Sequence, residues 1–235
     1  GSLAAFETVV GGPDVAAMLE SLAEVSLVAL ETVEGARRFH VLETLRGVAA
    51  ARLAAAGAED AARRRHAAFH LDLALRARAA LDGAEQAAWL DRLERDHDNL
   101  RLALAWLTTA AVDDALRLAT ALAPFWEVRG HLGEGRRRLA DALSSRPDAP
   151  PVVRAPALDA AGLLAWRQGD YAAAGGHHEA ALALWLELED DAGVARTLRR
   201  LGGVAWDLGE SELAGARYEE SLAGAEAIGD ETAIA

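Results

Sequence analysis

The sequence predicts a mostly α-helical protein in which a short β-hairpin near the N-terminus precedes an α-solenoid of stacked helix pairs. Hydrophobic residues make up 52% of the 235 residues and charged residues 26%, finely interleaved as in amphipathic helices. The only strand patterns lie within residues 26–42. In the C-terminal half, similar segments recur at an offset of 40 residues, which is the signature of a repeat architecture.

The composition excludes several classes of function. The chain has no cysteine, which rules out disulfides, cysteine zinc sites and thiol catalysis. Its net charge of −13 repels a phosphate backbone, so we expect no nucleic-acid binding by this chain. No apolar run approaches the roughly 18 residues that a membrane span needs. We therefore expect a cytoplasmic protein without a membrane partner.

Residues 1–57 have the layout of half of a winged helix, with a helix, a hairpin and a second helix in succession. The two strands flank a turn at Glu34-Gly35, and the second helix ends at Gly57. A proline near the first turn of the first helix costs little, because its missing N–H would be unpaired there. The four elements are expected at 13–22, 26–33, 38–42 and 43–56.

The remaining residues divide into a helical connector, 58–111, and a repeat region, 112–235, with about three repeats and a truncated last one. Asp96 to Asp98 supply a cap between two connector helices. Gly1-Ser2 without a methionine, and an ending that opens another helix, predict a piece of a longer protein. The helices are expected at 61–81, 86–93, 99–107, 113–129 and 132–144, followed by a loop at 145–151.

The repeat is clearest when residues 158–190 are shifted by 40 positions, which brings Trp166 onto Trp206. A weaker copy lies at Phe125 to Leu132. One helix pair cannot bury its apolar face alone, so neighbouring pairs must stack. The other identical pairs are Leu158/Leu198, Gly162/Gly202, Ala165/Ala205, Gly169/Gly209, Ala174/Ala214, Glu179/Glu219, Leu182/Leu222 and Asp190/Asp230.

Small residues stand where the two helices of a unit would cross closely, and Gly169 and Gly209 stand where the chain leaves a helix and favours a left-handed conformation. The run Ala-Gly-x-x-Ala-x-x-x-Gly-Asp-Tyr, followed by Ala-x-x-x-His-x-x-Ala-Leu, resembles the tetratricopeptide repeat. The period near 40 exceeds the usual length of about 34 and predicts longer helices. The small residues are Gly162, Ala174, Ala181, Gly202, Ala214 and Ser221.

Three earlier stretches, Leu27 to Arg46, Arg63 to His70 and Trp89 to Trp106, carry a wider resemblance. They resemble the region downstream of the ATPase in bacterial STAND-class regulators of the AfsR-like and LuxR-like kind. The resemblance implies a winged helix, a connector and tetratricopeptide repeats that sense an inducer or partner, with the ATPase domain of the same protein as a further partner. A Gly-x-x-x-x-Gly-Lys phosphate loop cannot be present, because all 24 basic residues are arginine.

The resemblance also implies that the first helix of each pair lines a concave groove for a ligand or partner. Tryptophan and arginine are typical anchors in such a concavity. The alternative is that these tryptophans pack between neighbouring repeats. The groove positions would be Asp159, Leu163, Trp166 and Arg167, then Arg199, Gly203, Trp206 and Asp207, with Thr120 and Glu127 in the weaker copy.

We expect no catalytic residue, cofactor or metal. His66 and His70 share a helix face without an evident third ligand, and His177 and His178 point to different faces. The arginine clusters are more simply solvated or paired with carboxylates. The sequence thus predicts a non-catalytic sensor or interaction module that binds a protein, peptide or small inducer. The alternative is an oligomerisation scaffold, including a homodimer through the last repeat.

Overall fold

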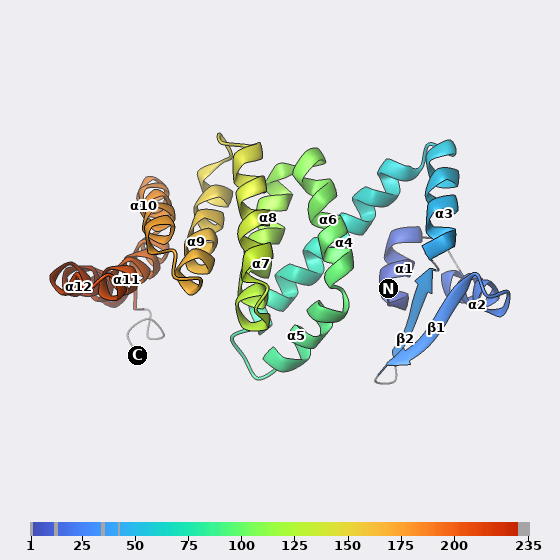
Figure 1. The fold of residues 1–235 in the computed structure, drawn as a ribbon, viewed down its shortest axis with the longest axis horizontal. Coiled ribbons are helices and arrows are strands. Elements are labelled where there is room, and N and C mark those ends of the chain that lie inside the picture. Colours follow the sequence, from blue (N-terminus) through green and yellow to red (C-terminus); the bar gives the residue numbers. More distant parts are fainter. Residues whose placement is uncertain (1, 12–13, 34–35, 42, 230–235) are drawn as a thin grey trace.

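The computed structural model describes residues 2–11, 14–33, 36–41 and 43–229. The described residues form 12 helices and one two-stranded antiparallel sheet. The hairpin and its helices lie at one end of an elongated arrangement, and α9 to α12 lie at the other (Figure 1). The predicted turn at Glu34-Gly35 and the helix start at Pro13 lie outside the described residues.

The N-terminal part contains helices and a hairpin in the predicted order. Strand β1 (Val28–Val33) pairs antiparallel with β2 (Ala36–Val41), and α2 (Val15–Glu24) and α3 (Glu43–Ala55) flank them in sequence. A further helix, α1 (Leu3–Val10), was not predicted. It is only eight residues long, and its one signal is the cap, where the Ser2 side chain accepts a hydrogen bond from the Ala5 N–H.

Three helices occupy the predicted connector: α4 (Glu59–Ala80), α5 (Gln86–Arg95) and α6 (His97–Ala110). The long helix α4 runs from the hairpin end to the middle of the molecule and packs against α6 and α7 (Figure 1). The predicted cap at Asp96 is correct in its position but lacks the capping hydrogen bond. Asp96 stands at the N-cap position of α6, but its side chain makes no capping hydrogen bond because it pairs with an arginine from the hairpin.

Three helix pairs follow, with the first helix of each pair next to that of the neighbouring pair. The predicted loop at 145–151 separates the first pair from the second. Gly169 and Gly209 end their helices with φ of +77° and +79°, the left-handed conformation that the sequence predicts. The helices are α7 (Val112–Arg129), α8 (Leu132–Ser145), α9 (Pro151–Arg167), α10 (Tyr171–Glu187), α11 (Asp191–Asp207) and α12 (Ser211–Ile228).

The apolar core consists of a small N-terminal cluster, a main cluster in the middle of the chain and a further small cluster around Ala165, Ala174 and Val204. A small cluster around Val15, Leu19, Val28 and Phe39 holds the N-terminal helices on the hairpin. The main core is continuous from α4 to α10, so the connector and the first repeats share one interior. No helix in the described part of the chain is long and apolar enough to cross a membrane.

Aromatic rings lie directly on glycines of neighbouring helices, which brings the helices of the repeats close together. A Cβ added to Gly162 would lie 2.6 Å from Cε1 of His178, and one added to Gly202 would lie 2.8 Å from Cε1 of Tyr218. The ring of Trp185 covers Gly193 of the next pair in the same way. The glycines are therefore required for the packing within and between pairs.

Adding one methyl group at these contacts should destabilise the protein. We expect Gly162→Ala to lower the free energy of unfolding by about 1–3 kcal/mol, because the fully buried His178 ring has no space to move into. The control is Gly176→Ala on α10, where an added Cβ meets no atom within 4 Å. That change should stabilise the helix by up to about 1 kcal/mol. Urea denaturation measures both, and equal effects would contradict the packing argument.

Candidate functional site

Most of the predicted groove residues with aromatic or charged side chains belong to two series spaced by 40 residues on the first helices of the three pairs, and Trp126 extends one of these series without having been predicted. Three tryptophans, Trp126, Trp166 and Trp206, form one series, and Glu127, Arg167 and Asp207 form the other. Two side-chain contacts join the three helices. Nε of Arg167 donates to Oε1 of Glu127 at 2.6 Å, and Nε1 of Trp166 donates to Oδ2 of Asp207 at 2.6 Å.

The exposure of the tryptophans increases along the series. Trp126 is fully buried, Trp166 is half-buried, and Trp206 is 64% exposed. Trp166 packs on Gly203 of the following pair, with Cζ2 3.0 Å from the position of an added Cβ, and the Arg167 guanidinium lies over its ring. Each tryptophan before the last is thus covered by residues of the following helices, whereas Trp206 is open.

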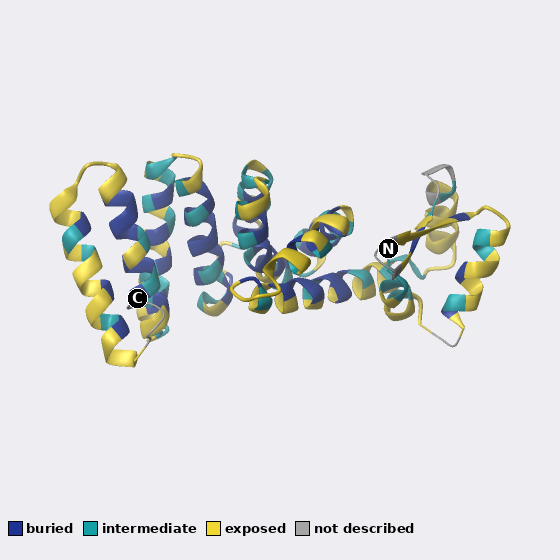
Figure 2. Ribbon diagram, turned by 90° about the horizontal axis from the view of Figure 1, so that it is seen from below, coloured by how far each residue is buried: buried dark blue, intermediate teal, exposed yellow. Residues whose placement is uncertain are grey.

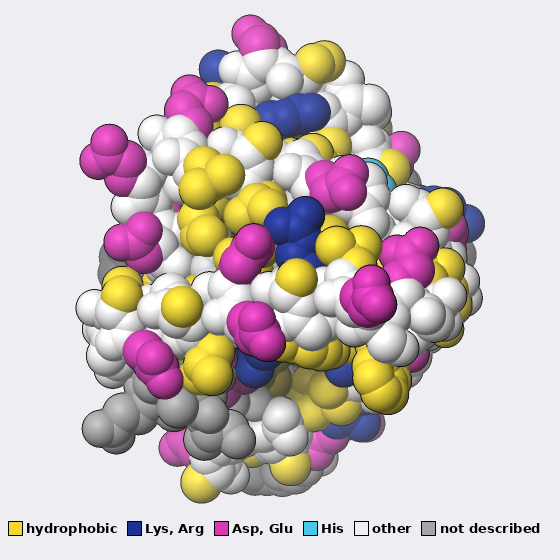
Figure 3. Space-filling view, turned by 90° about the vertical axis from the view of Figure 1, so that its left-hand side faces the viewer, with side chains coloured by type: hydrophobic (Ala, Val, Ile, Leu, Met, Phe, Trp, Pro, Cys, Tyr) yellow, Lys and Arg dark blue, Asp and Glu magenta, His cyan; other side chains and the backbone are white. Residues whose placement is uncertain are grey.

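Other apolar side chains are exposed near the C-terminal end of the described chain. Leu208, Leu213 and Leu222 are 52%, 46% and 44% exposed. The helix at this end is largely exposed (Figure 2), and the view onto it shows hydrophobic side chains gathered among Asp and Glu side chains (Figure 3). An apolar surface with an acidic surround is the type of surface that another protein element covers.

Asp159 differs from its predicted place in the groove, because it is only 3% exposed. Its Oδ1 accepts a hydrogen bond from Nδ1 of His178 at 2.9 Å, and its Oδ2 lies 2.5 Å from NH1 of Arg200. Burial acts to raise the pKa of Asp159, but the His178 hydrogen bond and the Arg200 charge outweigh burial and lower it to about 2. The carboxylate therefore ties α9, α10 and α11 together and is not open to a ligand.

The other predicted groove positions vary in exposure. Arg199 is exposed, Leu163 and Thr120 are half-buried, and Gly203 is buried beneath the Trp166 ring. Of the predicted residues, Arg167, Arg199, Trp206 and Asp207 are therefore the ones most accessible to a partner.

A joint that connects the hairpin, the connector and the first helix pair forms at the junction of α5 and α6, and no sequence pattern indicated it. The Asp96 carboxylate pairs with the Arg38 guanidinium of β2 at 2.7 Å, and both side chains are nearly buried, at 6% and 11% exposure. Five residues later, on α6, Arg101 donates to both oxygens of Glu134 on α8, at 2.8 and 2.5 Å. One short segment therefore contacts both the hairpin and the first helix pair.

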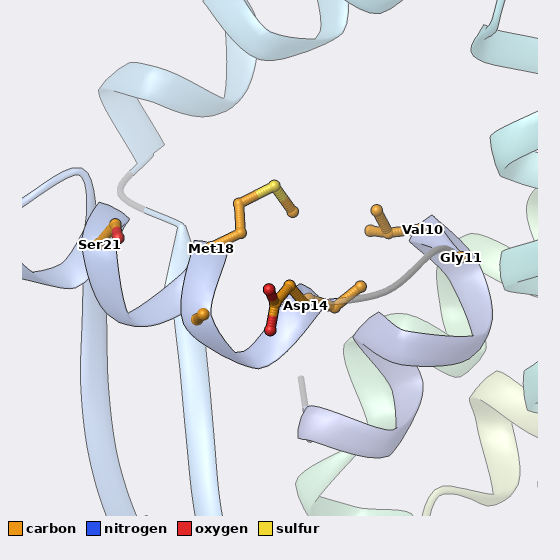
Figure 4. Close-up of a pocket in the computed structure, with 7 residues that line it drawn as sticks. Val10, Gly11, Asp14, Met18 and Ser21 are labelled. Carbon is orange, nitrogen blue, oxygen red and sulfur yellow. The ribbon is translucent and has the colours of Figure 1, made fainter.

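The hollows on the described part of the molecule include two near its ends. One between α1 and α2 is lined by Val10, Asp14, Met18 and Ser21 (Figure 4), and lacks the convergent polar groups of a ligand site. Another lies between α10 and the last pair, and its lining includes Gly175, Leu213 and Arg217 but none of the predicted groove residues. We place no binding site in either.

The histidine pairs considered from the sequence are engaged in contacts of their own. The rings of His66 and His70 lie 4.2 Å apart, and Nδ1 of His70 lies 2.8 Å from the His66 carbonyl oxygen. His178 is fully buried against Asp159. These contacts explain the positions of the histidines without a ligand.

Comparison with known sequences identifies the repeats. The sequence model of the tetratricopeptide repeat family matches residues 154–227, which cover α10, α11 and most of α9 and α12. Such repeats mediate protein–protein interactions. The chain is therefore a mostly helical protein with tetratricopeptide-type repeats, which point to a non-catalytic interaction module.

The chain is also similar to longer regulators. Proteins named as HTH-type transcriptional regulators, from Mycobacterium bovis and from two strains of Mycobacterium tuberculosis, are each 32% identical over 214 residues. The matches cover 85% of this chain but only 24% of each relative's length. The solved structure of BtubC (BKLC) from P. vanneervenii has a TM-score of 0.56 at 16% identity, covering 96% of this chain and 92% of that chain. This last likeness concerns the fold alone.

Breaking the joint at Asp96 should destabilise the protein more than breaking an exposed ion pair. We expect Arg38→Ala to lower the free energy of unfolding by about 3–5 kcal/mol, because it leaves the Asp96 carboxylate buried without its partner. The control is Arg37→Ala on the same strand, whose pair with Glu20 is exposed and should contribute less than about 1 kcal/mol. Denaturation with guanidinium chloride measures the free energy of unfolding of both variants. Similar decreases would show that the buried pair does not hold the hairpin and the connector together.

Burial of His70 should make stability depend on pH. Burial, and secondarily the charge of His66, lowers the pKa of His70 from 6.5 to about 4, although Asp96 acts in the opposite direction. Between these values the unfolded chain binds more protons, so the free energy of unfolding should fall as the pH drops from about 6.5 to 4.

Denaturant unfolding at a series of pH values tests this dependence. His70→Gln should show a shallower fall than the wild type over that window. His40→Gln, at an exposed position on β2, should retain the wild-type slope. A wild-type slope in His70→Gln would rule out His70 as the source.

Proposed function

We propose that this chain is the sensor and interaction module of a STAND-class transcriptional regulator, and that its repeats bind a protein, peptide or small inducer along the first helices of the pairs. The accessible residues Arg167, Arg199, Trp206 and Asp207 would form the contact surface. Trp166 and Glu127 would position Asp207 and Arg167 through the hydrogen bonds described above. A ligand that binds one arrangement of the full protein more tightly than another would then shift the equilibrium toward the first arrangement.

The spacing of the helices supports an α-solenoid with a period near 40. Helix α9 begins at Pro151 and α11 at Asp191, 40 residues later, and α10 and α12 begin at Tyr171 and Ser211 with the same offset. The glycine–aromatic contacts recur at this offset too, at Gly162 and Gly202. Repeats of one length packed through one kind of contact favour a regular stack with an extended binding surface.

The exposure of Trp206 is the single observation that carries the proposal. Its counterparts Trp126 and Trp166 are covered by the following helices, whereas Trp206 is 64% exposed beside other exposed apolar residues. Exposed tryptophan with arginine nearby is the composition of an interaction hot spot. We propose that a partner covers it in the full protein.

The proposed division of the chain is a winged-helix-like segment at 1–57, a connector at 58–111 and repeats at 112–235. The separate small core at the hairpin supports the first boundary. The continuous core across the second boundary supports a rigid connector that moves with the repeats. The chain matches 24% of the length of HTH-type transcriptional regulators, which supports a place in a longer regulator. We propose an ATPase domain of that protein as a partner, in a cytoplasmic setting.

A binding screen with matched variants tests the proposal. Thermal shift and tryptophan fluorescence would be measured with acidic peptides, basic peptides and bacterial metabolites as separate pools. A true ligand should bind the wild type and the control variant Leu102→Ala equally well. Leu102 on α6 is 60% exposed, close to the 64% of Trp206, but lies outside the proposed surface. Trp206→Ala and Arg199→Ala should weaken it by about tenfold or more with unchanged circular dichroism. Equal affinity for all four proteins would reject the proposed surface.

The alternative function, an oligomerisation scaffold, is favoured by the apolar end around Leu213 and Leu222. It predicts a concentration-dependent dimer of the wild type that Trp206→Ala or Leu222→Ala weakens. Sedimentation measures this equilibrium. A monomer at all concentrations together with a ligand from the screen supports the sensor, whereas a dimer without a ligand supports the scaffold.

A further inference from the structure

A cluster of histidine and glutamate side chains lies where the connector meets the first helix pair. Glu94 stands near the end of α5, His97 at the first position of α6, and His131 between α7 and α8. These three residues come from two junctions that are distant in sequence, and the contact of α6 with α7 and α8 brings them together.

Each of the three side chains offers one ligand atom, and these atoms all lie within 4.8 Å of one another. Nε2 of His131 lies 3.2 Å from both carboxylate oxygens of Glu94, and Nδ1 of His97 lies 4.0 Å from Oε1 of Glu94. The two imidazole rings lie 4.4 Å apart. The nitrogen and oxygen atoms are therefore arranged around a common centre.

The environment of His97 fits the role of a metal ligand. The residue is only 6% exposed, and its Nε2 atom is buried without a hydrogen-bond partner among the described residues. That atom lies 3.5 Å from Oε2 of Glu134, whose carboxylate is held by two hydrogen bonds from Arg101. An imidazole that binds a metal through one nitrogen usually donates its other N–H to a carboxylate held in this way.

We propose that Glu94, His97 and His131 bind a divalent transition-metal ion, with Zn²⁺ as the best match. Two imidazoles and one carboxylate suit zinc, whereas Mg²⁺ and Ca²⁺ prefer sites made of oxygen alone. Nδ1 of His97 and Nε2 of His131 would be the nitrogen ligands, and Glu134 would position His97 through Nε2. A fourth coordination position stays open to water.

Small movements close the site around the ion. Zinc bonds to nitrogen and carboxylate oxygen are about 2.0–2.2 Å long, so the ligand atoms must approach one another by up to about 1 Å. The side chains of Glu94 and His131 are 43% and 28% exposed and are free to adjust, whereas the His97 ring is fixed against Phe125 at a centroid distance of 5.2 Å. The bound ion would cross-link the α5–α6 junction to the turn between α7 and α8.

Calorimetric titration of the chelator-treated chain with ZnCl2 tests this proposal. The wild type should bind one equivalent. Glu94→Gln and His131→Ala, at the two exposed positions, should weaken binding at least tenfold, and Glu134→Gln should weaken it about 10–100-fold. The control is His177→Ala, which removes a histidine from α10 and should bind as the wild type does. Circular dichroism verifies the fold of each variant.

Cobalt substitution provides a readout that does not depend on affinity. Co²⁺ bound by two histidines and a carboxylate should give the visible absorption of a four-coordinate site, and His131→Ala should change it. The proposal is overturned if the wild type takes up no zinc, or if Glu94→Gln and His131→Ala bind it as tightly as His177→Ala. The cluster would then be a set of histidine–carboxylate ion pairs.

Discussion

The structure depends on the close approach of neighbouring helices where an aromatic ring lies on a glycine. At Gly162 and Gly202 the ring comes from the second helix of the same pair, and at Gly193 and Gly203 it comes from the preceding pair. These contacts leave no space for a methyl group, so they set both the distance and the register between helices. The same packing rule therefore acts within a pair and between pairs, which lets pairs stack in one direction.

The stacking of helix pairs in one direction also bears on the exposed surface around Trp206. Gly203 of α11 lies against Trp166 of the preceding pair, Gly135 of α8 lies against Trp126, and among the described residues the surface of α11 around Trp206 is exposed. The charged groups follow the same direction, since the Asp159 carboxylate of α9 is neutralised by arginines from α11. Apolar and ionic contacts thus both extend from one pair to the next, and the exposed face at Trp206 is a product of the packing that stabilises the interior.

The sequence predicted the helices, the hairpin and the left-handed glycines because these depend on local pattern and on recurrence. It did not predict the burial of Asp159, since a position in the repeat specifies a helix face but not which arginines of the next helix cover it. It missed α1, whose eight residues give too short a pattern. It also read Asp96 as a cap, because the competing partner, Arg38, is 58 residues away in the chain.

The missed residues share a physical origin, which is contact between elements that are distant in sequence. Residues 94–101 contact the hairpin through Asp96 and the first helix pair through Arg101, with His97 between them. Since the connector also shares its core with the repeats, this segment is a place where the hairpin, the connector and the repeats meet, beside α4, which contacts both α1 and α7. Charged and imidazole groups of one short segment therefore connect the hairpin to the first helix pair. Any ligand of the cluster at His97 would bind on the segment that makes these contacts.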